Sequence, residues 1–138
     1  MIVDASVLLS AFFPDEAQPQ AQALLREHVA RRITLKAPDL LPYEFANAVW
    51  QAERRGRISG EQADQILQSI RGLEIELAPV RWEESLPLAR QFGRSIYDAA
   101  YLTLAQAKNE TLITGDQHLY NAVKDGLDFV IFIGDYQA

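Results

Sequence analysis

The chain has 138 residues and no cysteine, with 49% hydrophobic and 23% charged residues and a formal net charge of −6. These values are typical of one globular domain spanning residues 1–138, and they exclude disulfides and thiolate chemistry. No apolar run approaches the length of a membrane span, and no basic leader precedes the first strand, so we expect a cytoplasmic protein. The negative charge argues against broad coating of nucleic acid, but not against a nuclease whose acids lie in one site.

The first half of the chain predicts two strands and three helices. Short apolar runs rich in β-branched residues predict buried strands, and longer amphipathic runs predict helices. Proline and glycine separate these segments, and we expect Asp15 to cap the second helix. The expected elements are a strand at 1–3, a helix at 5–13, a helix at 15–32, a strand at 33–37 and a helix at 43–55.

The second half continues the alternation of strands and helices. Ser59-Gly60-Glu61-Gln62 fits a capping box, and Ser95 is expected to cap a later helix. The expected elements are helices at 60–71, 83–92, 96–107 and 117–123, and strands at 74–80, 111–114 and 129–133.

The order of these elements predicts the fold class. Apolar strands that alternate with helices indicate a mostly parallel sheet, here of four to five strands, with helices on both faces. The sequence therefore predicts a three-layer α/β/α domain.

Four acids occupy equivalent places along this chain. Asp4 follows the first strand and Asp116 follows the strand at 111–114, whereas Glu44 and Asp98 lie in the first turns of helices. Helices that follow parallel strands begin at the carboxyl edge of the sheet, where ligands of open α/β folds bind. We therefore expect the four carboxylates to meet at that edge.

Each acid also has a purely structural interpretation. Asp4 and Asp116 suit helix N-caps, Glu44 and Asp98 suit the positive end of a helix, and Ser95 with Asp98 resembles a capping box. Together the four acids favour a functional interpretation, because bringing carboxylates together is costly and helix capping does not require it. Two carboxylates about 4 Å apart repel by ~1 kcal/mol in water and ~4 kcal/mol at an effective dielectric of 20. With no basic partner evident, such a cluster suits Mg²⁺ or Mn²⁺, which take oxygen ligands and activate water for phosphoryl transfer. On this basis Asp98→Asn is expected to stabilise the metal-free protein.

The blocks around these acids resemble one known family. The chain is similar to PIN-domain ribonucleases, and most similar to their VapC toxin branch, over essentially its whole length. No single block is specific, but the four together, in this order and spacing, are. The matching blocks are Met1-Ile2-Val3-Asp4-Ala5-Ser6, Pro42-Tyr43-Glu44-Phe45-Ala46-Asn47-Ala48, Tyr97-Asp98-Ala99-Ala100-Tyr101 and Leu112-Ile113-Thr114-Gly115-Asp116.

The resemblance implies an activity and a set of roles. It implies an endoribonuclease that uses Mg²⁺ or Mn²⁺ to hydrolyse RNA, acts as the toxin of a toxin–antitoxin pair, forms a homodimer and is blocked by its cognate antitoxin protein. Gly115 departs from the pattern, because many relatives carry alanine there. The catalytic, metal-binding acids of the family match Asp4, Glu44, Asp98 and Asp116, and its supporting polar positions match Ser6, Asn47 and Thr114.

Other functional classes compete with this interpretation. A haloacid-dehalogenase-like phosphatase needs an Asp-x-Asp pair after the first strand, but Ser6 stands at the second position. A receiver domain needs a phosphoacceptor aspartate after a central strand and a late lysine, and neither is evident. A non-catalytic RNA- or protein-binding module of the same fold stays open.

Three further groups of residues carry their own expectations. Arg90 and Arg94 precede Asp98 and are expected to reach an RNA backbone. Tyr97 and Tyr101 are expected to pack in the core or in an interface. The helices at 43–55 and 60–71 carry more apolar residues than one domain face covers, which predicts a homodimer. These apolar residues are Phe45, Val49, Trp50, Ile66, Leu67 and Ile70. The nearby basic cluster of Arg54, Arg55 and Arg57 is expected to be a solvated helix end, with a contact to RNA phosphate or to a partner protein as the alternative.

Overall fold

The computed structural model describes residues 1–138 as five short strands, seven α-helices and a final 3₁₀ turn, η1 (Ile133–Asp135). None of the helices combines the length and the apolar composition that crossing a membrane requires. The strands are β1 (Ile2–Val3), β2 (Lys36–Pro38), β3 (Glu76–Ala78), β4 (Leu112–Thr114) and β5 (Val130–Phe132). The helices are α1 (Ala5–Phe12), α2 (Pro19–Val29), α3 (Leu41–Arg54), α4 (Gly60–Gly72), α5 (Trp82–Phe92), α6 (Ile96–Lys108) and α7 (Gln117–Val123).

The strands form one sheet in the order β3-β2-β1-β4-β5, and every neighbouring pair is parallel. β1 lies in the middle, with Ile2 opposite Lys36 on one side and opposite Leu112 on the other. Both residues of β1 are fully buried, as a central strand covered on both faces must be. The predicted parallel sheet is therefore confirmed, with five strands.

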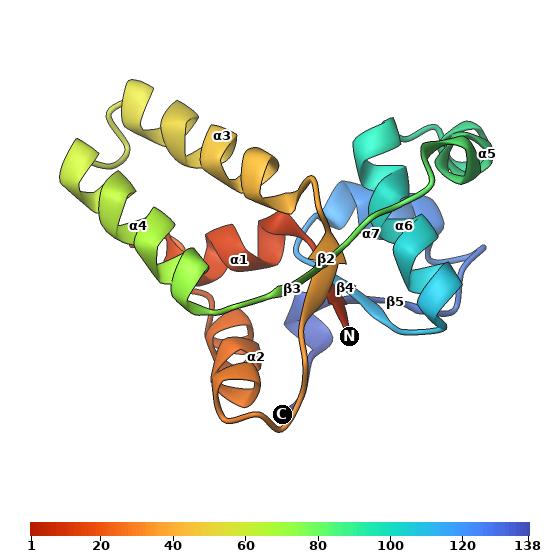
Figure 1. Cartoon of the computed structure of the whole chain (residues 1–138), viewed down its shortest axis with the longest axis horizontal. Helices are drawn as coiled ribbons and strands as arrows, with labels where there is room; N and C mark the ends of the chain where they lie inside the picture. Colours follow the sequence, from red (N-terminus) through yellow and green to blue (C-terminus); the bar gives the residue numbers. More distant parts are fainter.

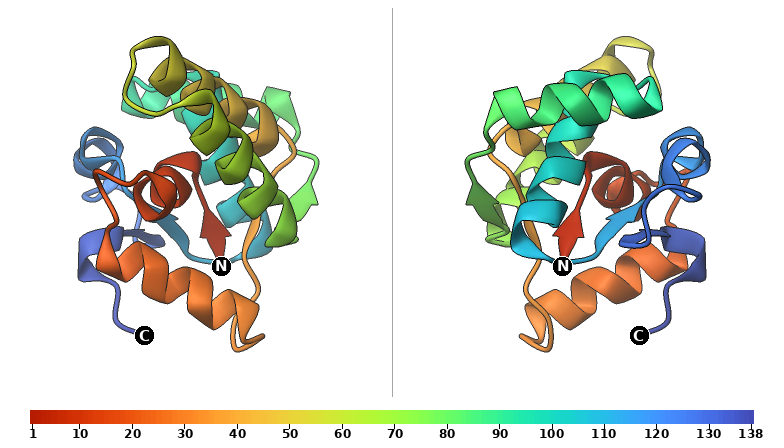
Figure 2. Two further views of the ribbon diagram at one scale, coloured as in Figure 1. Left: turned by 90° about the vertical axis from the view of Figure 1, so that its left-hand side faces the viewer. Right: turned by 90° about the vertical axis from the view of Figure 1, so that its right-hand side faces the viewer.

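Helices cover both faces of this sheet. Because the crossovers are right-handed, the helices that connect β1 to β2 and β2 to β3 lie on one face of the sheet. The helices that connect β3 to β4 and β4 to β5 lie on the other face. Figure 1 shows this division, with α1 to α4 on one side of the strands and α5 to α7 on the other. In the side views, α2 and the C-terminus lie at the end of the molecule opposite to α3 and α5 (Figure 2). The predicted three-layer α/β/α architecture is confirmed.

The second helix begins later than the local pattern predicts. Gln18, not Asp15, is the N-cap of α2, and its side chain accepts a hydrogen bond of 2.7 Å from the Ala21 N–H. Pro19 takes the first helical position, where its missing N–H costs nothing. Asp15 instead forms an ion pair with Arg57, at 2.7 Å. The prediction that Asp15 caps this helix was therefore wrong.

The second strand is shorter than predicted, because two N–H groups before it are bound to α2 and not to a neighbouring strand. The strand expected at 33–37 pairs only over Lys36–Pro38. The Ile33 N–H donates to the Glu27 carbonyl at 3.5 Å, and the Leu35 N–H donates to His28 Nδ1 at 3.1 Å. These bonds to α2 remove two donors that a longer strand would have used.

Candidate active site

Two of the predicted acids are brought together because their strands are neighbours. Asp4 follows β1 and Asp116 follows β4, and the two strands pair in register. Both acids are also helix caps: Asp4 Oδ1 accepts the Val7 N–H at 3.3 Å, and Asp116 Oδ1 accepts the His118 and Leu119 N–H groups at 2.9 and 3.0 Å. The capping role uses one oxygen of each carboxylate. It therefore leaves the other oxygen for a second role.

Two hydroxyl groups hold the Asp4 carboxylate in place. The Thr114 hydroxyl donates to Oδ2 and accepts the Asp116 N–H at 3.0 Å. The Ser6 hydroxyl donates to Oδ1 and accepts the Gly115 N–H at 2.8 Å. Burial raises the pKa of Asp4 to about 6, although the hydrogen bonds lower it in part. Ser6 and Thr114 thus fix one buried carboxylate between the segments that follow β1 and β4.

Glu44 reaches the same edge of the sheet from the first turn of α3. Its Oε2 accepts a hydrogen bond of 3.3 Å from the hydroxyl of Tyr101 on α6. Burial raises the pKa of Glu44 to about 7, with further contributions from the negative charges of Asp4 and Asp98. The Glu44 carboxyl is therefore close enough to two other acids to feel their charge.

Tyr101 has a role that the sequence does not reveal. It is 2% exposed, which confirms the predicted packing in the core, whereas Tyr97 is 64% exposed and does not pack there. Its hydroxyl nevertheless reaches Glu44, which lies 57 positions away in the chain. No local pattern connects two residues on different helices at that distance, so only the fold could show this contact.

Arg94 is the basic partner that the sequence seemed to lack. Its Nε and one Nη donate to Asp98 Oδ2 at 3.1 and 2.9 Å, and the same Nη lies 3.8 Å from Asp116 Oδ2. The expectation of an acid cluster without a basic partner was therefore wrong. The signal was present in the sequence, because an arginine and an aspartate four residues apart around a helix start can meet.

Two predicted residues make no contact with these acids. Asn47 is exposed on α3 and forms no hydrogen bond with Glu44. Arg90 is exposed on α5 and forms no ion pair with any acid. The two arginines that the sequence treats alike are thus in different environments.

The four carboxylates define a negatively charged edge, but they do not form a finished metal cage. No group of three or more acidic, histidine or cysteine side chains stands in an arrangement that could hold a metal ion. The donor chemistry nevertheless fits a hard divalent cation, because every donor is a carboxylate oxygen. Burial is the main cause of the raised pKa of Asp4 and of Glu44, and the charges of neighbouring acids add to it, which is repulsion that a cation relieves.

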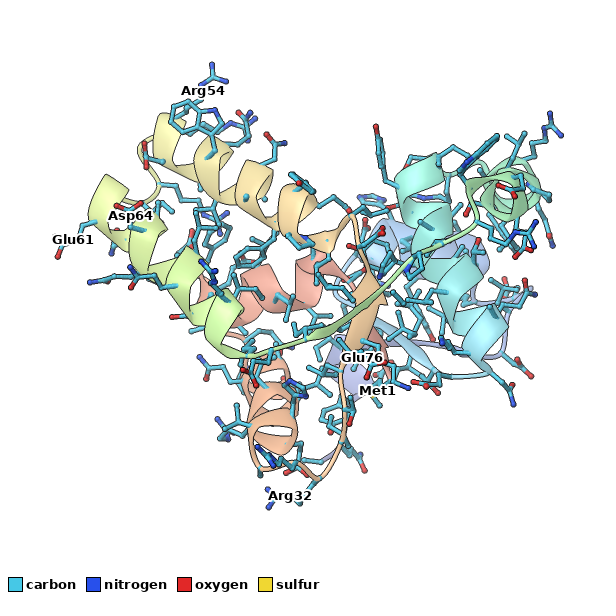
Figure 3. All side chains as sticks on the ribbon, in the orientation of Figure 1. Met1, Arg32, Arg54, Glu61, Asp64 and Glu76 are labelled. Carbon is cyan, nitrogen blue, oxygen red and sulfur yellow. The ribbon has the colours of Figure 1, made fainter.

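The basic cluster at the end of α3 extends toward this edge, because Arg55 and Arg57 line a pocket of about 330 Å³ together with Ser6 and Gly115. Figure 3 shows Arg54 at the end of α3 farthest from the strands. Its guanidinium carbon lies 5.8 Å from the centre of the Trp50 ring, and Arg57 pairs with Asp15. Arg54, Arg55 and Arg57 are all exposed, as expected of a solvated helix end.

The fold and the acidic edge define the class to which this chain belongs. The PIN-domain family model matches residues 1–125, so the chain is a member of the PIN-domain family. It is 30% identical to ribonuclease VapC3 of Pyrobaculum aerophilum, over 86% of this chain and 91% of the relative. It is 32% identical to ribonuclease VapC9 of Mycobacterium tuberculosis, over 86% of this chain and 87% of the relative. The crystal structure of PAE2754 from Pyrobaculum aerophilum has the same fold, with a TM-score of 0.71 and 24% identity over 96% of this chain and 90% of that one.

Proposed function

We propose that this protein is a divalent-metal-dependent endoribonuclease and the toxin of a toxin–antitoxin pair. Relatives that carry the name VapC ribonuclease, at about 30% identity over most of both chains, support the ribonuclease activity. The single structural observation that carries the proposal is the Asp4 carboxylate, buried at the carboxyl edge of the sheet with three further acids around it. Such a toxin would act on RNA in the cytoplasm.

The four acids are the residues that would hold the cation. Asp4, Asp98 and Asp116 would contribute carboxylate oxygens directly, and Glu44 would contribute directly or through a water molecule. When bound there, Mg²⁺ or Mn²⁺ supplies activation of water and stabilisation of the charge that develops on the phosphate. In such a hydrolysis water would add to phosphorus and lose a proton, one P–O ester bond would break, and the leaving oxygen would take up a proton.

The neighbouring residues prepare the acids for this task. Ser6 and Thr114 fix the orientation of the Asp4 carboxylate through hydroxyl donors. Tyr101 does the same for Glu44. These three hydroxyl donors already point at the carboxylate oxygens. The acidic side chains therefore need little reorientation when a charged group binds at this edge.

Cleavage of RNA with and without metal tests the proposal. The protein should cut a mixture of RNAs, a closed circular RNA among them, in Mg²⁺ or Mn²⁺, and EDTA should stop the reaction. A circle has no end, so its cleavage identifies an endonuclease. Asp116→Asn should abolish cleavage, whereas Asp64→Asn, at an exposed position of α4 (Figure 3), should not. Cleavage that persists after thorough chelation would overturn the metal-dependent mechanism.

We further propose that the toxin forms a homodimer and binds an antitoxin protein. The surface argument for a dimer is weaker than the sequence suggests, because Phe45, Val49 and Ile66 are at most 7% exposed within one subunit. The large hydrophobic side chains left exposed on α3 are Tyr43 at 81% and Trp50 at 51%, and a largely apolar groove of about 400 Å³ lies between α3, α4 and β3. Light scattering at tens of micromolar checks the dimer, and a monomer mass there would contradict it.

A further inference from the structure

The side chain of Arg94 lies at the edge where the proposed function needs a cation. It forms the only ion pairs that any of the four acids makes with a basic residue. It is 23% exposed, so the pair with Asp98 is partly shielded from water. The Arg94 guanidinium therefore places a positive charge beside Asp98 and Asp116, which are two of the proposed metal ligands.

The backbone on both sides of Arg94 is fixed, while its side chain is held only by the acids. Gly93 ends α5 in the left-handed conformation, with φ of 63°, and the Arg94 N–H donates to the Ala89 carbonyl at 3.1 Å. One residue later, the Ser95 hydroxyl caps α6 by accepting the Asp98 N–H at 3.0 Å. Two helix caps therefore aim the Arg94 side chain at this edge. When the charge on Asp98 is neutralised, the guanidinium can turn without any change in the backbone.

The chemistry of a guanidinium gives it a second partner at the same place. Its planar fork of N–H donors matches a phosphate as well as a carboxylate, and it stays charged at any pH of interest. A divalent cation on Asp98 and Asp116 would weaken their attraction for Arg94 and repel its charge. The phosphodiester of a bound RNA is then the anion available to it.

We propose that Arg94 alternates between two partners: it is the counter-ion of Asp98 and Asp116 when no cation is bound, and it contacts the RNA phosphate when a cation is bound. Binding of the cation and binding of RNA are thereby linked through one side chain. This inference rests on the proposed function, because it requires that these acids hold a divalent cation. Linkage of this kind is reciprocal, so bound RNA also raises the affinity for the cation.

Arg90 provides a matched control for the charge alone. It is an arginine only four positions earlier, but it is exposed on α5 and has no ion pair with an acid. Arg90→Gln therefore removes the same charge as Arg94→Gln without removing a partner of Asp98. Arg94→Lys keeps the charge but loses the planar fork.

Calorimetric titration with Mn²⁺ tests the first half of the linkage. Arg94→Gln should bind Mn²⁺ several-fold to about tenfold more tightly than the parent protein, because the competing charge is gone. Arg90→Gln should bind like the parent, and Arg94→Lys should lie between the two. Circular dichroism and melting curves first show that each variant is folded. Equal Mn²⁺ affinities for the parent and Arg94→Gln would overturn the proposal, even if the variant melts at a lower temperature.

Fluorescence anisotropy with a short, single-stranded RNA that carries phosphorothioate linkages tests the second half. Mn²⁺ should raise the affinity of the parent and of Arg90→Gln for this RNA by several-fold more than it raises that of Arg94→Gln. The same increase in all three proteins would overturn the linkage. If the parent binds neither Mn²⁺ nor Mg²⁺, the proposed function itself fails. If it binds Mn²⁺ and Arg94→Gln binds no differently, only the role of Arg94 fails.

Discussion

The buried carboxyl of Asp4 makes the stability of the metal-free protein fall as the pH rises. The pKa of this group is about 6 in the folded chain, against an ordinary value of 3.8. A carboxyl with a raised pKa holds its proton more tightly in the folded state than in the unfolded state. Its contribution to stability is therefore fully present below about pH 4, and it is lost as the pH rises through about 6. Asp4→Asn keeps the shape of the side chain but cannot titrate.

The size of the effect follows from the pKa. At pH 5, about one unit below the folded pKa, the folded carboxyl is about ten times more often protonated than ionised, while the unfolded carboxyl is almost fully ionised. A tenfold bias corresponds to about 1.4 kcal/mol, and it has vanished by about pH 8. The free energy of unfolding of the parent, relative to Asp4→Asn, should therefore fall by about 1.4 kcal/mol over this range. Repulsion between ionised Asp4 and Glu44 acts in the same direction.

Urea unfolding in EDTA at several pH values between 5 and 8 measures this difference. The asparagine disturbs the hydroxyl donors of Ser6 and Thr114 by an amount that does not depend on pH, so the slope with pH is the quantity that matters. Asp64→Asn, on the exposed face of α4, should follow the parent. Parallel curves for the parent and Asp4→Asn would refute the argument from burial. Saturating Mg²⁺ should reverse the slope of the parent, because ligand carboxyls must lose their protons to bind it.

Because Asp98 forms an ion pair with Arg94, the stabilisation expected from relief of charge repulsion is reversed. Asp98→Asn should lower the free energy of unfolding of the metal-free protein by about 1 kcal/mol or less. A higher melting temperature of the variant in EDTA would contradict this. In the same protein Mg²⁺ should give a much smaller rise in melting temperature than in the parent, which thermal denaturation with and without the ion compares. Tyr101→Phe removes the hydroxyl donor from Glu44, so it should cost about 1 kcal/mol and raise the pKa of that carboxyl. The step in the pH–rate profile of RNA cleavage that reflects ionisation of Glu44 should therefore move to a higher pH. A pH–rate profile identical to that of the parent would contradict the role of this hydrogen bond.

Local patterns were enough to predict the order of the elements and the layers of the fold. Apolar runs, many of them bounded by proline or glycine, indicate the strands and helices, and a parallel sheet follows from their alternation. The capping residues Ser59 and Ser95 were predicted correctly, because each bonds to a backbone N–H only three residues away. Helix caps of this kind depend only on neighbouring residues, so the sequence pattern is enough to predict them.

Features that depend on distant residues could not be predicted in the same way. Asp15 is a good cap by residue type, but its partner Arg57 lies 42 positions away. The bond between Tyr101 and Glu44 likewise joins two helices that only the sheet brings together. The apolar surface that motivates the predicted dimer is smaller than the sequence suggests for a similar reason, since Phe45 faces the interior of its own subunit, and the dimer itself stays a prediction. The roles of the four acids themselves stay predictions.

The position of β1 in the sheet has a consequence for how the protein is made. β1 is the second and third residue of the chain, yet its partner on one side is β4, and the Asp4 carboxylate is bound by Thr114, 110 positions later. A chain still growing on the ribosome therefore carries Asp4 from the outset without the residues that hold it. The acidic edge can form only after synthesis has passed Asp116. Chains released before that point lack the residues that hold Asp4, so premature termination yields no assembled site.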